Sequence, residues 1–179
     1  SEKKVSVIVP CHNSGKWVNR CVDSLFNQTM DPEDMEIILV DDCSDDDTWE
    51  VLSMLEQEHS EDAVIIIHND RHVGPGGARN LALSYASAPY VAMVDSDDWV
   101  EKDYLSSLHN AITKDDADLA VCGMILDYAN GAHEVYAPSV EEIFELSPKN
   151  TNKFVDLNEK YLLYGPCIKL YKRQIISNN

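Results

Sequence analysis

Three aspartates lie within the four residues Asp95-Ser96-Asp97-Asp98, directly after the apolar run Tyr90–Val94. Carboxylates this close repel one another by several kcal/mol in a partly buried site, so either some carry a proton or a cation lies among them. Their hard oxygen atoms suit Mg²⁺ or Mn²⁺, which keep bound waters and accept phosphate oxygens from a substrate. A solvated acidic turn that caps the next helix is an equal alternative, and these residues alone leave both interpretations open.

A second acidic pair, Asp41-Asp42, ends the apolar run Met35–Val40. One of its carboxylates can accept a hydrogen bond from a nucleobase N–H or from a ribose hydroxyl. The same residue types are also common in a strand-to-helix loop, where they cap the helix. The pair by itself favours neither interpretation.

The segment Gly74–Asn80 contains three glycines and precedes a predicted helix. Glycines allow the backbone to approach a ligand closely, and a helix N-terminus favours phosphate. The segment matches neither the dinucleotide-binding fingerprint nor a Walker loop, and a plain tight turn is the more frequent explanation. Arg71 and Arg79 nevertheless supply positive charge where a phosphate would need it.

The elements that position these residues alternate between strands and helices. Four apolar, β-branched runs predict strands: Val5–Val9, Met35–Val40, Ala63–Ile67 and Tyr90–Val94. Three helical patterns separate them: one near Gly15 capped by Ser14, one led by Ser44 with Asp47 in its first turn, and one over Gly77–Ala86. This alternation predicts an α/β fold, with a mainly parallel sheet covered by helices on both faces. The polar groups that end the four strands should then lie on one edge of the sheet.

The pattern after Trp99 is less regular. It predicts a helix through Leu105, Leu108 and Ile112, a strand over Leu119–Ile125, a hairpin turn at Asn130-Gly131 with a return strand over Glu134–Tyr136, a loop with one short helix over 138–153, and a last strand over Cys167–Tyr171. We therefore expect a small C-terminal region of hairpin and loop.

Composition narrows the classes of partner. The chain has 179 residues, enough for one domain, and 14 Lys and Arg against 32 Asp and Glu, for a formal charge of −18. Such a surface repels phosphate backbones, which argues against nucleic acid as a partner. A phosphorylated small molecule can still bind where a divalent cation or nearby arginines offset the field.

The cysteines, histidines and apolar runs indicate whether disulfides, a zinc site or a membrane span is expected. The five cysteines form no Cys-x-x-Cys pair, and Cys21 lies on the apolar face of a predicted helix, so we expect reduced thiols in the cytoplasm. His12, His68 and His72 lack the paired spacing with Cys or Glu that a zinc site needs. No apolar run approaches the roughly 20 residues of a membrane span, so attachment to the inner face of a membrane would need regions outside this chain.

Four segments in series resemble the opening of the family 2 inverting glycosyltransferases, over about the first hundred residues. They are Val5–Pro10 with Asn13, Ile38–Thr48, Asn69 with Gly74 and Ala78-Arg79-Asn80, and Val94–Asp98. Each segment is weak evidence alone, but four in the family's order and spacing are specific. Gly165–Arg173 also resembles a later segment of bacterial members, with lower specificity. The resemblance implies a GT-A fold, a nucleoside-diphosphate sugar donor that is most often UDP-linked, Mn²⁺ or Mg²⁺, and a glycan or lipid-linked acceptor.

The resemblance also implies roles for individual residues. Eight would contact the nucleotide sugar, the first two in the uridine and ribose pocket: Pro10, Asn13, Asp41, Asp42, Arg71, Arg79, Asp95 and Ser96. Of these, Asp41 or Asp42 would contact the base, and Asp95 the ribose or sugar. Asp97 would ligate the metal, and Asp98 could share that role.

The general base of such enzymes is a carboxylate that follows the segment resembling Gly165–Arg173, and it removes the proton of the acceptor hydroxyl. We therefore expect the base beyond Asn179, and donor binding with little transfer by these 179 residues. We divide the chain into a nucleotide-binding half, 1–100, and the start of an acceptor half, 101–179.

Two other functions compete with this one. A nucleotidyltransferase would present a glycine-rich basic loop after the first strand, where this chain has Pro10–Gly15. A non-catalytic nucleotide-binding module is the second alternative, and it would suit a chain without a general base.

Overall fold

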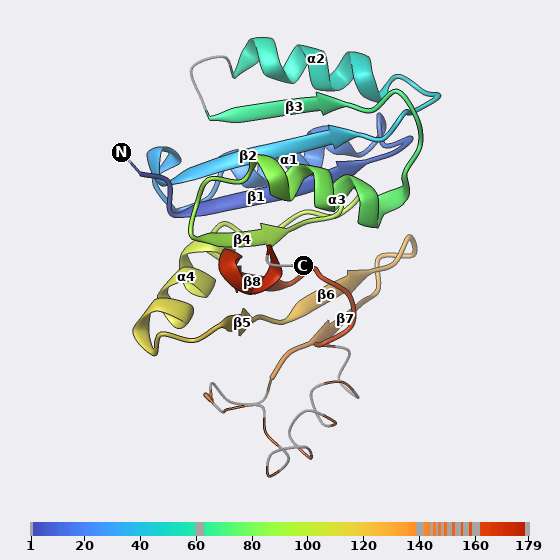
Figure 1. Cartoon of the computed structure of the whole chain (residues 1–179). Coiled ribbons are helices and arrows are strands. Elements are labelled where there is room, and N and C mark those ends of the chain that lie inside the picture. The colour runs from blue at the N-terminus through green and yellow to red at the C-terminus, as the bar shows by residue number, and fades with distance from the viewer. Residues whose placement is uncertain are drawn as a thin grey trace.

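The computed structural model describes residues 2–59, 63–138 and 162–177, with single residues between them (142, 143, 145, 147, 149, 152, 155 and 158). Its centre is a six-stranded sheet in the order β3-β2-β1-β4-β8-β5 (Figure 1). The strands are β1 (Val5–Cys11), β2 (Met35–Asp41), β3 (Val64–His68), β4 (Tyr90–Met93), β5 (Leu119–Val121) and β8 (Lys169–Lys172). β1 to β4 are parallel, whereas β8 runs antiparallel to β4 and to β5. The predicted mainly parallel sheet is confirmed.

Helices cover both faces of the sheet. α3 (Gly74–Tyr85) packs on one face, and α1 (Val18–Phe26), α2 (Thr48–Glu58) and α4 (Tyr104–Lys114) pack on the other (Figure 1). Alternation along the strands explains this division, because successive side chains point to opposite faces. In β1, Val7 and Val9 join the cluster under α1, α2 and α4, while Ile8 joins the cluster under α3.

The starts of the first three helices differ from the sequence predictions. α1 begins at Val18 without a side-chain cap, because the Ser14 hydroxyl lies 2.6 Å from the Ser96 hydroxyl. At α2, Asp46 rather than Ser44 accepts the Thr48 N–H, at 3.0 Å. α3 begins at Gly74, three residues before the predicted start. In the first case a contact distant in sequence has replaced the expected local cap.

The C-terminal part contains the predicted hairpin, with one break in a strand. β6 (Met124–Asp127) pairs with β7 (His133–Tyr136) around Gly131, which has a φ of +83°. The strand predicted over Leu119–Ile125 ends at Val121 and resumes at Met124. Gly123 lies in this break, where a Cβ atom would come within 2.7 Å of a backbone oxygen, so only glycine fits there.

β8 begins at Lys169, two residues later than predicted, because Ile168 has a φ of +57° that is incompatible with a strand. Two short helices complete the described elements, η1 (Pro32–Asp34) and α6 (Arg173–Ile176). The loop predicted over 138–153 falls mostly outside the described residues. Across the described part of the chain, no helix has the length and apolar character needed to cross a bilayer.

Candidate functional site

A cleft of about 560 Å³ lies where β1, β2 and β4 end and α3 begins. We call this edge of the sheet the carboxyl edge. The cleft is lined by the strand-end segments and by the first turns of two helices: Pro10, Cys11, His12, Asn13, Ser14, Trp17, Asp42, His72, Pro75, Ala78, Arg79, Asp95, Ser96 and Asp97. Its volume is within the range of small-molecule sites, roughly 300–1,000 Å³. The predicted convergence of the strand ends is confirmed by the register of the sheet. Cys11 at the end of β1 lies beside Asp41 at the end of β2, which lies beside His68 at the end of β3.

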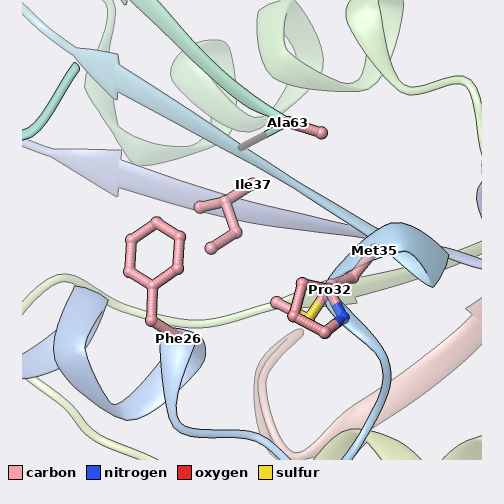
Figure 2. Close-up of a pocket in the computed structure, with 5 residues that line it drawn as sticks. All are labelled: Phe26, Pro32, Met35, Ile37 and Ala63. Atoms are coloured by element: carbon pink, nitrogen blue, oxygen red, sulfur yellow. The ribbon is translucent and has the colours of Figure 1, made fainter. Parts of the chain in front are cut away.

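A second hollow lies at the opposite end of the sheet. Figure 2 shows its lining side chains, Phe26, Pro32, Met35, Ile37 and Ala63, all of them apolar. Its volume is about 10 Å³, and roughly that much space is needed to hold a single water molecule. The polar cleft at the carboxyl edge is therefore the candidate site.

Asp42 lies on the wall of the cleft, and its carboxylate accepts three hydrogen bonds. It accepts hydrogen bonds from the Asn69 side chain at 2.9 Å, the Val73 N–H at 2.9 Å and the Gly74 N–H at 2.8 Å. His72 Nδ1 lies 2.9 Å from the same carboxylate. Burial acts to raise the pKa of Asp42, but these hydrogen bonds and His72 outweigh it and lower the pKa below its usual value. Asp42 is therefore ionised in the folded protein at neutral pH.

Asp41, the other member of the pair, is fully buried behind the cleft. One carboxylate oxygen lies 2.7 Å from His68 Nδ1, and the other accepts the Ser44 N–H at 3.3 Å. It is not among the lining residues. The structure thus separates two carboxylates that the sequence left equivalent: Asp42 borders the cleft, and Asp41 supports its floor.

Arg79 and Asp95 form an ion pair across the cleft, between α3 and the end of β4. Their closest atoms are 2.5 Å apart, and the arginine side chain is only 16% exposed. The buried Arg79 Nε has no hydrogen-bond partner among the described residues. A guanidinium in this position can hold Asp95 with one edge and retain a free donor.

The Asp95–Asp98 segment is a turn closed by a hydrogen bond from the Asp98 N–H to the Asp95 carbonyl, at 3.0 Å. Ser96 is buried and its hydroxyl contacts Ser14, which joins this turn to the segment after β1. Asp97 is exposed and lines the cleft, whereas Asp98 does not line it. Burial and the negative charges of Asp97 and Asp95 raise the pKa of Asp98 to about 6. Asp95 is compensated by Arg79, whereas Asp97 and Asp98 form no ion pair among the described residues.

The residues at this turn fit a divalent cation. Among the described residues, no three His, Cys, Asp or Glu side chains are grouped closely enough to hold a metal by themselves. Mg²⁺ and Mn²⁺ do not require such a group, because they bind through one or two carboxylates together with waters and substrate phosphates. Asp97, whose carboxylate is exposed on the cleft wall, can supply such a ligand.

Half of the lining residues were not predicted as contacts, namely Cys11, His12, Ser14, Trp17, His72, Pro75 and Ala78. Three of these, His12, His72 and Trp17, bring aromatic rings to the cleft. The two histidine rings lie against each other, with centroids 4.2 Å apart. His12 Nδ1 lies 3.0 Å from the Asp42 carbonyl oxygen, so Nδ1 carries the proton. The Trp17 ring is 45% exposed at the start of α1. A signal was present in the sequence for His12, which directly follows the first strand, but none marked His72 or Trp17.

Of the other residues predicted to contact the nucleotide sugar, two line the cleft and one does not. Pro10 and Asn13 line the cleft, and Asn13 adopts a left-handed backbone with a φ of +52°. Its backbone N–H donates to the Ser44 hydroxyl at 3.0 Å, and its side-chain oxygen accepts the Asp45 N–H at 2.8 Å. Arg71 is exposed and lies outside the lining residues. Of the two arginines predicted to lie near a phosphate, the structure brings only Arg79 to the cleft.

Comparison with known proteins agrees with this geometry. The family model of glycosyl transferase family 2 matches residues 6–178. The chain belongs to that family. This membership decides against the nucleotidyltransferase alternative, and it agrees with the resemblance seen in the first hundred residues.

Two relatives illustrate the similarity. The poly(ribitol-phosphate) beta-glucosyltransferase of Bacillus spizizenii is 33% identical over 178 residues, which are 98% of this chain and 26% of the relative. The crystal structure of residues 1–349 of S. aureus TarS superposes with a TM-score of 0.76 at 27% identity, over 98% of this chain and 49% of that one. The same fragment in complex with UDP gives a TM-score of 0.73 at 25% identity, over 98% of this chain and 48% of that one.

These neighbours are GT-A glycosyltransferases, so the predicted fold class is confirmed. The chain spans about a quarter of the length of the B. spizizenii protein and about half of the TarS fragment. The predicted division at residue 100 is tested by none of these comparisons and stays a prediction.

Proposed function

We propose that this chain binds a UDP-sugar in the cleft at its carboxyl edge, for transfer of the sugar with inversion to a glycan or lipid-linked acceptor. Membership of family 2 and the UDP complex of TarS support the donor class. The single observation that carries the proposal is the cleft itself. It brings together the ionised carboxylate of Asp42, the guanidinium of Arg79 and the exposed carboxylate of Asp97.

The base and ribose are proposed to lie over the ends of β1 and β2. Pro10 and Asn13 line this part of the cleft, and Asp42 is its carboxylate. Since Asp42 stays ionised, it remains a strong acceptor for a nucleobase N–H. We assign this contact to Asp42 and not to Asp41, because Asp41 is buried and already engaged by His68.

The diphosphate is proposed to lie between α3 and the turn after β4. Arg79 lines this part of the cleft and would contribute its positive charge, and Asp97 would offer a carboxylate oxygen for a cation shared with the phosphates. A bound Mn²⁺ or Mg²⁺ would offset the negative charge of the leaving nucleoside diphosphate. Asp95 holds Arg79 in place, and its carboxylate lines the cleft where a ribose or sugar hydroxyl would lie.

The acceptor is proposed to be a glycan or lipid-linked glycan of a bacterial surface polymer. The support comes from relatives, since the B. spizizenii protein is named for transfer to poly(ribitol-phosphate).

Thermal unfolding with UDP and Mn²⁺ tests the donor proposal. We expect saturating UDP with Mn²⁺ to raise the Tm by several degrees, because a ligand that binds only the folded state stabilises it. Asp97→Ala should abolish the part of the rise that depends on Mn²⁺. Glu56→Ala removes an exposed carboxylate from the far end of α2, and it should leave the rise unchanged.

Calorimetry distinguishes the contribution of the nucleotide to binding from that of the metal. UDP should bind with measurable heat, more tightly with Mn²⁺ than without it, and GDP should bind more weakly than UDP. Absence of binding by UDP under both conditions would refute the proposed donor. If UDP bound equally tightly with and without Mn²⁺, the metal-binding role of Asp97 would be refuted, but the proposed donor would stand.

A further inference from the structure

Two tryptophans and two cations lie together where the cleft meets α1. Trp17 lines the cleft and is 45% exposed, and Trp99, directly after the acidic turn, is 38% exposed. The Lys16 ammonium lies over the Trp17 ring, with Nζ 4.4 Å from the ring centroid. The Arg20 guanidinium lies over the Trp99 ring, with Cζ 3.1 Å from the ring centroid. We call these four residues the cation–aromatic strip.

The start of α1 and the segment after β4 hold the strip together. The Val100 N–H donates to the Ser24 hydroxyl at 3.1 Å, which ties the residue after Trp99 to α1. Trp17 is the N-cap of α1 and precedes Arg20 by three residues, a spacing that makes side chains neighbours on a helix surface. The two stacked pairs therefore lie beside each other along α1, and of the four residues only Trp17 lines the cleft.

The two cations stand out in an acidic chain. The formal charge is −18, and within the described residues neither Lys16 nor Arg20 forms an ion pair with a carboxylate. Stacking uses the face of a guanidinium and leaves its planar fork of N–H donors, which matches the geometry of phosphate. The acidic turn directly precedes Trp99, and a divalent cation bound at that turn would offset its repulsion of an anion. The strip therefore suits an anionic ligand with apolar surface.

We propose that the cation–aromatic strip binds the acceptor, and that this acceptor is a glycan or polyol chain that carries phosphate groups. The inference rests on the proposed function, because it assigns a surface to the acceptor of that transfer. Phosphates contact Lys16 and Arg20, and the C–H surfaces of the chain pack on the two tryptophan rings. Since Trp17 lies on the cleft wall, the end of the acceptor chain enters the cleft beside the donor.

A membrane surface fits the strip less well than a single chain does. Attraction to anionic lipids takes a cluster of about four to eight cations. The strip contains two, on a chain with a formal charge of −18. A chain that carries phosphate groups needs only the few contacts that the strip provides.

Tryptophan fluorescence tests the proposal, with an oligomer of ribitol phosphate as the probe, the acceptor chemistry named for the B. spizizenii relative. The chain has three tryptophans, so Trp49→Phe leaves Trp17 and Trp99 as the only reporters. We expect the oligomer to shift their emission, with an affinity that falls as salt screens the charges. A neutral glucan oligosaccharide of the same length should bind roughly 10-fold more weakly, because it lacks the charged contacts.

Two single substitutions that each remove one cation provide the matched comparison. Arg20→Ala should weaken binding of the oligomer by roughly 5-fold, as expected for loss of one exposed charged contact. Lys114→Ala removes an exposed cation from the last turn of α4 and should leave the affinity unchanged. Circular dichroism and the Tm of each variant establish that it is folded.

Three results would overturn the proposal. They are equal affinities of folded Arg20→Ala and Lys114→Ala, oligomer binding that leaves the emission of Trp17 and Trp99 unchanged, and Arg20-dependent binding to phosphatidylglycerol vesicles without binding of the oligomer. Calorimetry with UDP on the wild type is a separate measurement. Failure of the oligomer alone would leave the proposed donor standing, whereas failure of UDP to bind would overturn the donor and the acceptor role of the strip with it.

Discussion

Two acidic segments end strands of the same sheet, yet their electrostatic surroundings are opposite. After β2, the Asp42 carboxylate is surrounded by N–H donors, and its pKa is lowered. After β4, Asp98 is surrounded by other carboxylates, and its pKa rises to about 6. The residue types are the same in both segments. What differs is which part of the chain folds against them.

The turn that starts α3 supplies the donors to the first segment. It points the Val73 and Gly74 N–H groups at Asp42, so this carboxylate is part of the fold as well as part of the cleft wall. In the described ranges no comparable turn donates to Asp97, which is exposed to the cleft. The first segment is therefore part of the hydrogen-bond network of the fold, whereas the second leaves the Asp97 carboxylate exposed in the cleft.

The largest effect should follow removal of the Asp42 carboxylate. Asp42→Ala leaves several buried donors without an acceptor, at about 1–3 kcal/mol each, so we expect a loss of about 3 kcal/mol in the free energy of unfolding. Urea denaturation measures it. Asp45→Ala, an exposed position in the same loop, should change the free energy by less than about 0.5 kcal/mol. Equal effects of the two substitutions would remove the contrast between the acidic segments.

Arg79 should matter more for ligand binding than for stability. Arg79→Met removes the guanidinium that pairs with Asp95 and faces the cleft. Hydrogen bonds to charged groups contribute about 1.5–3 kcal/mol, so we expect UDP affinity to fall by roughly 10- to 100-fold in calorimetry. Arg79→Lys should recover only part of the loss, since an ammonium lacks the planar fork of donors. Wild-type affinity in Arg79→Met would show that the phosphates lie elsewhere.

The pH dependence of stability should reveal the lowered pKa of Asp42. A carboxyl with a depressed native pKa contributes stability above its unfolded value of 3.8, and this contribution is lost as the pH falls through the native value. The stability gap between the wild type and Asp42→Asn should therefore be constant from pH 7 to pH 5 and narrow below about pH 4. Urea midpoints at several pH values measure it, and a gap that widens in acid would contradict the assignment.

The contribution of Asp98 to stability should depend on pH in the opposite direction to that of Asp42, and its effect should be the smallest of the four. Its raised pKa means that its contribution to stability is fully present below the unfolded value of 3.8 and is lost as the pH rises through about 6. Asp98→Asn should therefore raise the Tm at pH 7 relative to the wild type, but not at pH 4. Solvent screening limits the gain to under about 1 kcal/mol, or roughly 2 °C. A decrease in Tm at pH 7 would contradict it.

Much of the fold could be predicted because its signals are local. The runs that became β1 to β4 are apolar and β-branched, and the stripe of Val18, Cys21, Val22 and Leu25 is buried in α1. The parallel arrangement of β1 to β4 followed from their alternation with helices, whereas the order of the strands was not predicted. The predicted starts of helices were less accurate, since Ser14 is engaged by Ser96, which lies 82 residues away.

What the sequence by itself determined is the sheet, its polar carboxyl edge and the family, because burial patterns and short motifs are written in consecutive residues. Only the tertiary structure decided that Asp42 borders the cleft while Asp41 is buried behind it. It also decided that Arg79 and not Arg71 reaches the cleft, and that His72 lines it. The reason is physical. A carboxylate's charge and its free acceptor positions depend on donors brought from segments about 30 residues away, and no local pattern records where those donors point.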